Sequence, residues 1–259
     1  MRLPLSLLAI IVMLTLTAPL IAPFDPMSTG AGPSMQSPNS EHLFGTDWLG
    51  RDVFSRMLYG GRRTLFVSSL ATMISVVSGG IIGLSAGTLG SKADSIITVF
   101  INSLLAIPPL VIALITLTLL GQGTVQLALA TGIAQIAIFA QMTRSAALAV
   151  SSAEFIESAR AIGASRLHII VYYILPNIKP TLLGYGGVIF AYSIINSAAL
   201  SFLGLGGDTG EPDWGVILAE SRMIFRTAPW VAVVSGLIIV ITVISVNTIA
   251  DHMASSERR

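Results

Sequence analysis

The sequence predicts an all-α integral membrane protein with about six transmembrane helices. Charged residues make up 10% of the 259 residues, whereas a soluble domain usually carries about 25%. The hydrophobic fraction is 53% and the mean hydropathy is +0.83. Five stretches contain no Asp, Glu, Lys or Arg, and each is long enough to cross a bilayer: residues 3–24, 64–91, 95–143, 180–207 and 227–250.

These stretches divide into six spans. A membrane-spanning helix needs roughly 20 apolar residues at 1.5 Å each, so the stretch 95–143 is long enough for two. Gly121-Gln122-Gly123-Thr124 interrupts it with a polar, turn-forming segment. Pro108-Pro109 should kink the helix before that turn. We expect spans near residues 4–23, 64–88, 95–119, 125–149, 181–203 and 230–250.

The first apolar run follows Arg2, and a cleaved signal peptide is the alternative to a membrane helix here. The run is longer than a usual signal-peptide core, and Ala22-Pro23-Phe24 is not a small-x-small cleavage site. Both features favour a retained helix. Six spans place both termini on one side of the membrane, and eight of the 14 Lys and Arg residues lie on that side. The positive-inside rule therefore favours cytoplasmic termini, although only weakly.

The expected organisation has four parts. These are an N-terminal transmembrane helix in residues 1–24, an extracytoplasmic loop in 25–63, a transmembrane core in 64–250 and a cytoplasmic tail in 251–259. The core contains one long polar loop, residues 151–176, which lies alone on the cytoplasmic face.

Two short helices joined by a corner are predicted within 151–176. Ser151 and Glu154 have the spacing of a capping box. Gly163 can take the left-handed conformation that ends a helix. Ser165 can cap the next helix, and Pro176 should limit its continuation.

Small side chains on the first of these helices suit contact with another subunit. Ala159 and Ala161 would let a partner approach closely. Composition alone equally allows an interfacial helix that packs on lipid headgroups.

One motif in this loop carries a family resemblance. Glu157-Ser158-Ala159, then Gly163 and later Leu175-Pro176, resemble the E-A-A, G, I-x-L-P signature of binding-protein-dependent ABC importer permeases. Ser158 replaces the second Ala, and Ile174 lies one place later than the signature Ile. The resemblance implies a type I ABC importer permease fold in which this loop, with the coupling helix, sits in a groove of a cytoplasmic ATPase subunit.

Two further segments narrow the resemblance. Both segments are similar to the six-helix permease of dipeptide, oligopeptide and nickel importers. The first is His42-Leu43-Phe44-Gly45-Thr46-Asp47-Trp48-Leu49-Gly50-Arg51-Asp52-Val53-Phe54-Ser55-Arg56. The second is Leu200-Ser201-Phe202-Leu203-Gly204-Leu205-Gly206 followed by Trp214-Gly215. The similarity extends from about residue 41 to Asp251. It implies import of di- or oligopeptides, with nickel or a metal chelate as the alternative cargo.

The resemblance also implies partners. They are a homologous permease, two ATP-binding subunits and an extracytoplasmic solute-binding protein, assembled in the lipid bilayer of a bacterial plasma membrane. ATP and Mg²⁺ would bind the ATPase subunits, and this chain would hold no cofactor and catalyse no reaction. The residues implied to couple it to the ATPase are Glu154, Glu157, Ser158, Ala159, Arg160, Ala161, Gly163 and Ala164.

Other classes of function fit the sequence less well. There is no Walker-type phosphate loop, and neither Lys92 nor Lys179 lies in a glycine-rich segment. There is no Cys, and the three His are scattered, so no metal site is expected. A net charge of +1 gives no reason to expect a nucleic acid partner. An ion-coupled secondary transporter is a less favoured alternative because such carriers commonly keep ionisable groups inside the membrane.

Uncharged polar residues remain within the predicted spans. Ser193, Ser197 and Ser201 recur every four residues and share one helical face. The candidates for the translocation path are Ser193, Asn196, Ser197 and Asn102. The alternative is that they form interhelical hydrogen bonds worth about 0.6–2 kcal/mol each. Asn102 stands where relatives often have Asp, so no role of that carboxylate transfers here.

Gly79, Gly83 and Gly87 form two successive Gly-x-x-x-Gly steps. This spacing predicts close approach of a neighbouring helix, either in this chain or in the partner permease.

Overall fold

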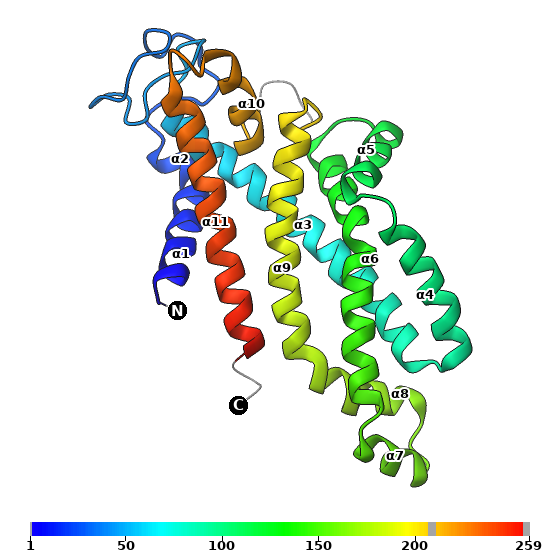
Figure 1. The fold of residues 1–259 in the computed structure, drawn as a ribbon. Coiled ribbons are helices and arrows are strands. Elements are labelled where there is room, and N and C mark those ends of the chain that lie inside the picture. Colours follow the sequence, from blue (N-terminus) through cyan, green and yellow to red (C-terminus); the bar gives the residue numbers. More distant parts are fainter. Residues whose placement is uncertain (1, 207–210, 256–259) are drawn as a thin grey trace.

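Long apolar helices run side by side through most of the molecule (Figure 1). The computed structural model describes residues 2–206 and 211–255 of the chain. In chain order the helices are α1 (Arg2–Leu16), α2 (Ala18–Ile21), α3 (Val53–Thr88), α4 (Ser91–Leu105), α5 (Pro109–Leu120), α6 (Thr124–Ser151), α7 (Glu154–Ala161), α8 (Arg166–Ile169), α9 (Leu175–Phe202), α10 (Trp214–Ile224) and α11 (Pro229–Ser255). A π-helical turn, Ile170–Ile174, joins α8 to α9.

Four helices in the described part of the chain are long and apolar enough to cross a membrane: Val53–Thr88, Thr124–Ser151, Arg166–Phe202 and Pro229–Met253. Together α4 and α5 pass the same test as a pair bent by 85°, which gives up to five spans if the pair counts as one broken span. The other expected span, 4–23, consists of the 15-residue α1, a break at Thr17 and the single turn of α2. Pro19 lies in the first turn of α2 and cannot donate a helical N–H, so it separates the two pieces.

The bend between α4 and α5 confirms the kink predicted at Pro108-Pro109. These prolines supply no N–H and disfavour a helical conformation in the preceding residue. The predicted turn before residue 125 is also present, since Gly121 and Gly123 both have positive φ and α6 begins at Thr124.

The close neighbour of the three spaced glycines is α6 of the same chain. A Cβ added at Gly79 would lie 2.6 Å from the carbonyl oxygen of Ile136, and one added at Gly83 would collide with the carbonyl oxygen of Ala140. Ser75 also donates to the carbonyl oxygen of Gly132 at 2.8 Å. The alternative considered above, contact with the partner permease, is not needed to explain this spacing.

Helix α3 begins at Val53, whereas the sequence analysis placed residues up to 63 in a loop. Asp52 caps the helix, because its carboxylate accepts the N–H of Ser55 at 2.7 Å. The arginines in this first part of α3 suggested a solvated loop, but Arg56 and Arg63 are buried. At the other end of the chain, α11 continues to Ser255, so the expected tail 251–259 begins as helix, and 256–259 lie outside the described residues.

Two local predictions for the loop 151–176 are wrong. Ser151 does not cap α7, because it is the last residue of α6 and its hydroxyl donates to the carbonyl oxygen of Gly87 at 3.2 Å. Pro176 does not end the second helix. The N–H of Leu175 bonds five residues back to Ile170, and this wider turn lets the helix continue through Pro176 into α9.

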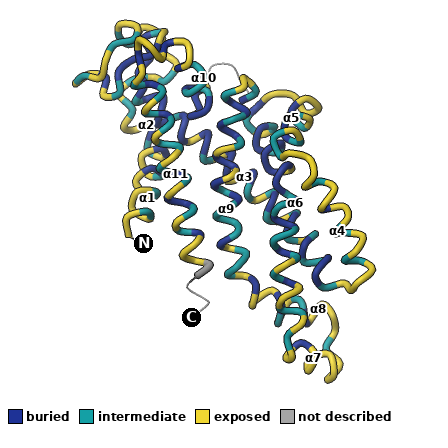
Figure 2. Tube along the Cα trace, viewed as in Figure 1, coloured by how far each residue is buried: buried dark blue, intermediate teal, exposed yellow. Residues whose placement is uncertain are grey.

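The two ends of the bundle differ (Figure 1). Residues 22–52 and α10 lie together at one end, and we call this region the cap. Helices α7 and α8 lie at the opposite end, and the start of α1 and the end of α11 also point away from the cap. Figure 2 shows buried residues where α3, α6 and α9 meet, and mostly exposed residues along α1 and α4.

Candidate functional site

Helix α7 and its corner form a compact unit at the end of the bundle opposite the cap. Ile156 and Ala159 are buried, and they pack with Ala147 of α6 and with Ile169 and Ile178. The apolar side of α7 is therefore covered by its own chain, which fixes the helix against α6 and α9. The rest of its surface is left for another contact.

The structure separates the predicted coupling residues by exposure. Six of them are exposed: Glu154, Glu157, Ser158, Arg160, Ala161 and Gly163. Ala164 is half-buried, and Ala159 is buried against its own chain. The expectation that Ala159 lets a partner approach is wrong. Ala159 follows Ile156 by three residues, so both side chains lie on the same inner face of α7. Ala161 remains available for that contact.

The corner after α7 is a complete Schellman motif. Gly163 has a φ of +86°. Its N–H bonds to the carbonyl oxygen of Arg160 at 3.0 Å, and the N–H of Ala164 bonds to that of Ala159 at 3.0 Å. Ser165 then caps α8 by accepting the N–H of His168 at 3.3 Å. The predicted left-handed, helix-ending conformation of Gly163 and the capping role of Ser165 are confirmed.

Ser158, which departs from the family signature, is accommodated within the helix. Its hydroxyl donates to the carbonyl oxygen of Glu154 at 3.1 Å, and the residue is exposed. A hydroxyl satisfied one turn back adds no buried polar group, so the substitution leaves the shape of α7 unchanged.

The polar residues proposed for a path lie in two kinds of environment. Ser193 is buried, accepts from Nε2 of Gln135 at 2.9 Å and lies 3.4 Å from the hydroxyl of Thr72. Ser197 is buried and donates to the carbonyl oxygen of its own helix at Ile194. Asn196 is half-buried and Asn102 is exposed. Ser193 thus links α9 to α6 and α3, Ser197 is satisfied within α9, and the two asparagines remain accessible.

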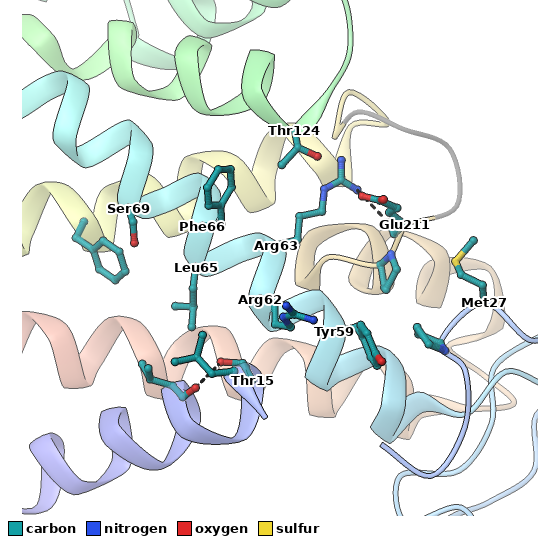
Figure 3. Close-up of a pocket in the computed structure, with 15 residues that line it drawn as sticks. Thr15, Met27, Tyr59, Arg62, Arg63, Leu65, Phe66, Ser69, Thr124 and Glu211 are labelled. Carbon is teal, nitrogen blue, oxygen red and sulfur yellow. Dashed lines mark hydrogen bonds and ion pairs between the residues drawn. The ribbon is translucent and has the colours of Figure 1, made fainter. Parts of the chain in front are cut away.

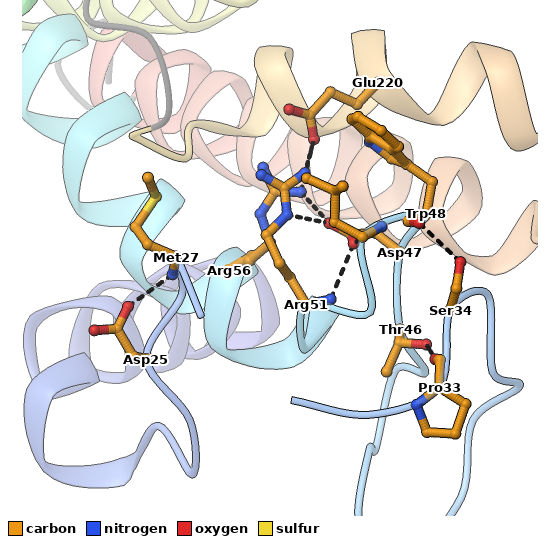
Figure 4. A network of polar contacts seen from close by, with 11 residues as sticks. Asp25, Met27, Pro33, Ser34, Thr46, Asp47, Trp48, Arg51, Arg56 and Glu220 are labelled. Atoms are coloured by element: carbon orange, nitrogen blue, oxygen red, sulfur yellow. Dashed lines mark hydrogen bonds and ion pairs between the residues drawn. The ribbon is translucent and has the colours of Figure 1, made fainter. Parts of the chain in front are cut away.

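A buried ion cluster in the cap was not foreseen from the sequence (Figure 4). Arg56 Nη1 lies 2.6 Å from Asp47 Oδ2 and 2.7 Å from Glu220 Oε2. Arg51 contacts the same two carboxylates at 2.7 Å each. Two cations and two anions balance in charge, and they join the loop, the start of α3 and α10. The motif around Asp47 and Arg51 was noted only as a family resemblance.

A second network ties the segment after α9 to α3. Arg63 donates to the carbonyl oxygens of Gly206 at 2.6 Å and Glu211 at 3.1 Å. Asp213 caps α10 and accepts the hydroxyl of Ser201 at 2.9 Å. Burial raises the pKa of the Asp213 carboxyl, and these hydrogen bonds and Arg63 oppose that rise.

No site for a metal ion is evident in the part of the chain that the structure describes. Within residues 2–206 and 211–255, no three His, Asp or Glu side chains are grouped so that they could hold a metal ion. Of the buried carboxylates of the cap, Asp47 pairs with arginine and Asp52 with His42 at 2.9 Å.

The same fold occurs in a known transporter. Two inward-facing crystal structures of the MetNI methionine ABC transporter match with TM-scores of 0.67 and 0.60, at 19% and 20% sequence identity. The first match covers 78% of this chain and 96% of the other, and the second covers 75% and 94%. With four or five apolar spans and a helical loop at one end, the chain has the fold of an ABC transporter permease.

Sequence comparison identifies the family. Residues 79–259 match the model of the binding-protein-dependent transport system inner membrane component, and the chain belongs to this family. It is therefore a multi-pass inner membrane protein, a transport subunit rather than an enzyme, that works with ATPase and binding-protein partners.

Curated relatives are similar over most of their length. A dipeptide transport system permease of Alkalihalophilus pseudofirmus is 33% identical over 93% of this chain and 80% of its own. A di/tripeptide transport system permease of Pseudomonas aeruginosa is 31% identical, covering 94% and 82%. A glutathione transport system permease of Pectobacterium atrosepticum is 35% identical, covering 84% and 72%.

Proposed function

We propose that this chain forms, with a homologous permease, the translocation path for di- or oligopeptides. The observation that carries the proposal is the 33% identity to a dipeptide permease over 93% of the chain. The glutathione relative also handles a compound with peptide character. Two ATP-binding subunits bind ATP and Mg²⁺, and a solute-binding protein delivers the peptide.

The two ends of the bundle suit two different partners. The exposed surface of α7 and its corner would dock on an ATPase in the cytoplasm, through Glu154, Glu157, Ser158, Arg160, Ala161, Gly163 and Ala164, with Ala159 holding the helix from behind. The cap would then lie outside and receive the binding protein. The termini would be cytoplasmic, consistent with the direction of α1 and α11 in Figure 1.

The path would be shared with the partner permease. Asn102 and Asn196 are accessible in this chain and would face the path. Ser193 and Ser197 are buried, and Ser193 would support the path by linking α9 to α6 through Gln135.

Cysteine labelling tests this orientation, since the chain has no native Cys. Ser37 is exposed in the cap and Arg160 is exposed on α7. In intact spheroplasts, a membrane-impermeant maleimide should label Ser37→Cys and should label Arg160→Cys only after permeabilisation. Position 210 lies outside the described residues and should label like Ser37. Labelling of Arg160→Cys from outside would reverse the orientation and remove α7 from the ATPase.

Reconstitution tests the function itself. Proteoliposomes containing both permeases, both ATPase subunits and loaded binding protein should accumulate a labelled dipeptide only with ATP. Glu157→Lys should reduce this uptake, because it replaces an exposed carboxylate in the first turn of α7 with a cation that the helix dipole disfavours. Glu157→Gln removes the charge without adding a cation and should reduce uptake less. Gradient-driven uptake of the dipeptide by this chain alone would exclude the importer-subunit function.

A further inference from the structure

A cavity of about 810 Å³ opens beneath the cap between α1, α3 and α9 (Figure 3). Its walls are largely apolar and include Val12, Leu65, Phe66 and Phe190. Thr15, Ser69 and Thr124 add hydroxyl groups. The volume lies within the range of small-molecule sites, and such sites usually combine apolar walls with a few polar groups that fix orientation.

Arg62 supplies the cavity with an uncommitted cation. The residue is exposed and lines the cavity. Its guanidinium carbon lies 5.9 Å from the centre of the Tyr59 ring. Within residues 2–206 and 211–255 the structure shows no hydrogen bond or ion pair for this guanidinium. Arg51 of the cap and Arg56 of α3, in contrast, have carboxylate partners 2.6–2.7 Å away. Arg62 is thus free to bind an anion.

Arg63 is a second and independent indication of an anion site. It lines the same cavity and is 8% exposed. Its two Nη atoms bond to the carbonyl oxygens of Glu211 and Gly206, and Nη1 also lies 3.8 Å from the Glu211 carboxylate, but its Nε is buried without a partner in the described structure. A buried guanidinium N–H without an acceptor is unfavourable, and an anion entering the cavity could satisfy it.

We propose that this cavity binds the C-terminal carboxylate of the translocated peptide at Arg62, with Nε of Arg63 as an additional donor. The inference rests on the proposed function, since it identifies the part of the peptide that the permease recognises. Arginine binds carboxylates through paired, charge-assisted hydrogen bonds. The apolar walls suit the peptide's side chains. The exposed carboxylate of Glu211 lies 3.8 Å from Nη1 of Arg63 at the cavity edge, so it partly neutralises Arg63 and leaves Arg62 as the main cation for the peptide carboxylate.

Peptide binding to the assembled complex tests the site. The complex of both permeases and both ATPase subunits is placed in phosphatidylcholine nanodiscs without binding protein. Equilibrium binding of a tritiated tripeptide and of its C-terminal amide is measured by scintillation proximity. The wild type should bind the free acid at least about tenfold more tightly than the amide, because the amide cannot form the charged pair.

Arg62→Gln should remove this preference by weakening only the binding of the free acid. Arg226→Gln is the matched control, since Arg226 is exposed, lies just after α10 and does not line the cavity. It should retain the wild-type preference. Because Arg62 is exposed, its replacement leaves no buried charge, and unchanged ATPase activity verifies assembly.

Three results would overturn the proposal. Arg62→Gln could keep the wild-type preference for the free acid, or the wild type itself could show no preference. Alternatively, native mass spectrometry could show a phospholipid retained by the wild type and lost in Arg62→Gln, which assigns the arginine to a lipid phosphate. ATP-driven peptide uptake by the same variants, reconstituted with loaded binding protein in proteoliposomes, separates failure of this site from failure of the proposed function. Uptake without acid preference refutes only this site, whereas absence of uptake refutes the proposed function.

Discussion

Replacing Gly163 by proline should reduce ATP-driven peptide transport by about tenfold or more while the helical bundle stays folded. Gly163 has a φ of +86°, and the proline ring fixes φ near −65°. Proline also lacks the N–H that bonds to the carbonyl oxygen of Arg160, and it disfavours the helical conformation of Ile162. The corner must therefore open, and the exposed surface of α7 would turn away from the ATPase. Uptake and ATP hydrolysis are measured with the reconstituted complex.

The surroundings of Gly163 provide the control. Among the described residues other than its chain neighbours, no heavy atom lies within 4 Å of a Cβ added at this position, so size alone should not matter there. Asparagine tolerates the left-handed conformation better than other non-glycine residues. Gly163→Asn should therefore retain most transport, and Gly163→Pro should retain ATP hydrolysis that no longer drives uptake. Wild-type transport by Gly163→Pro would show that the corner does not couple the subunits.

This corner could be predicted because its signals are local. A glycine at the end of a short helix and a serine two residues later specify a left-handed residue and a new cap within a few positions. The same holds for Pro108-Pro109 and for the turn before Thr124, where residue types that break helices decide the outcome. The apolar length of the major spans also follows from the sequence alone.

The cap could not be predicted in the same way, because its contacts join distant parts of the chain. Arg56 was assigned to a solvated loop, yet it pairs with Glu220, which is 164 residues away. Arg51 pairs with the same glutamate across 169 residues. Charge-rich segments usually indicate solvent exposure, and only the fold shows that these charges neutralise one another. The helix boundary at Val53 was missed for this reason.

Local signals can also be overruled by a neighbouring helix. The spacing of Ser151 and Glu154 fits a capping box, but the hydroxyl of Ser151 finds the carbonyl oxygen of Gly87 across the α3–α6 contact instead. That contact is itself set by glycines that allow α3 and α6 to approach closely. The burial of Ala159 likewise depends on Ala147 and Ile178, which come from other helices.

Replacing Arg56 by methionine should lower the free energy of unfolding by about 3–5 kcal/mol, the usual cost of removing one partner from a buried ion pair. Arg56 is 1% exposed and contacts Asp47 and Glu220. Without it, only Arg51 remains to neutralise these two carboxylates, and the cluster carries an excess negative charge in a buried site. Urea titration in mild detergent, followed by tryptophan fluorescence, measures the change, since Trp214 is buried in the cap at the start of α10.

The destabilisation by Arg56→Met should come mostly from the lost charge balance rather than from lost side-chain packing. A second substitution separates these two contributions. Arg56→Met combined with Glu220→Gln leaves one cation and one anion, Arg51 and Asp47, which lie 2.7 Å apart. The double variant should therefore be more stable than Arg56→Met alone, although it has lost two native side chains.

Arg222→Met is the control for removing an exposed arginine. The guanidinium of Arg222 lies 4.3 Å from the centre of the Phe202 ring and donates to the carbonyl oxygen of Ala219 in its own helix. That change should cost about 1 kcal/mol or less. If Arg56→Met is no more destabilising than Arg222→Met, or if Glu220→Gln worsens it, the cluster does not hold the cap together.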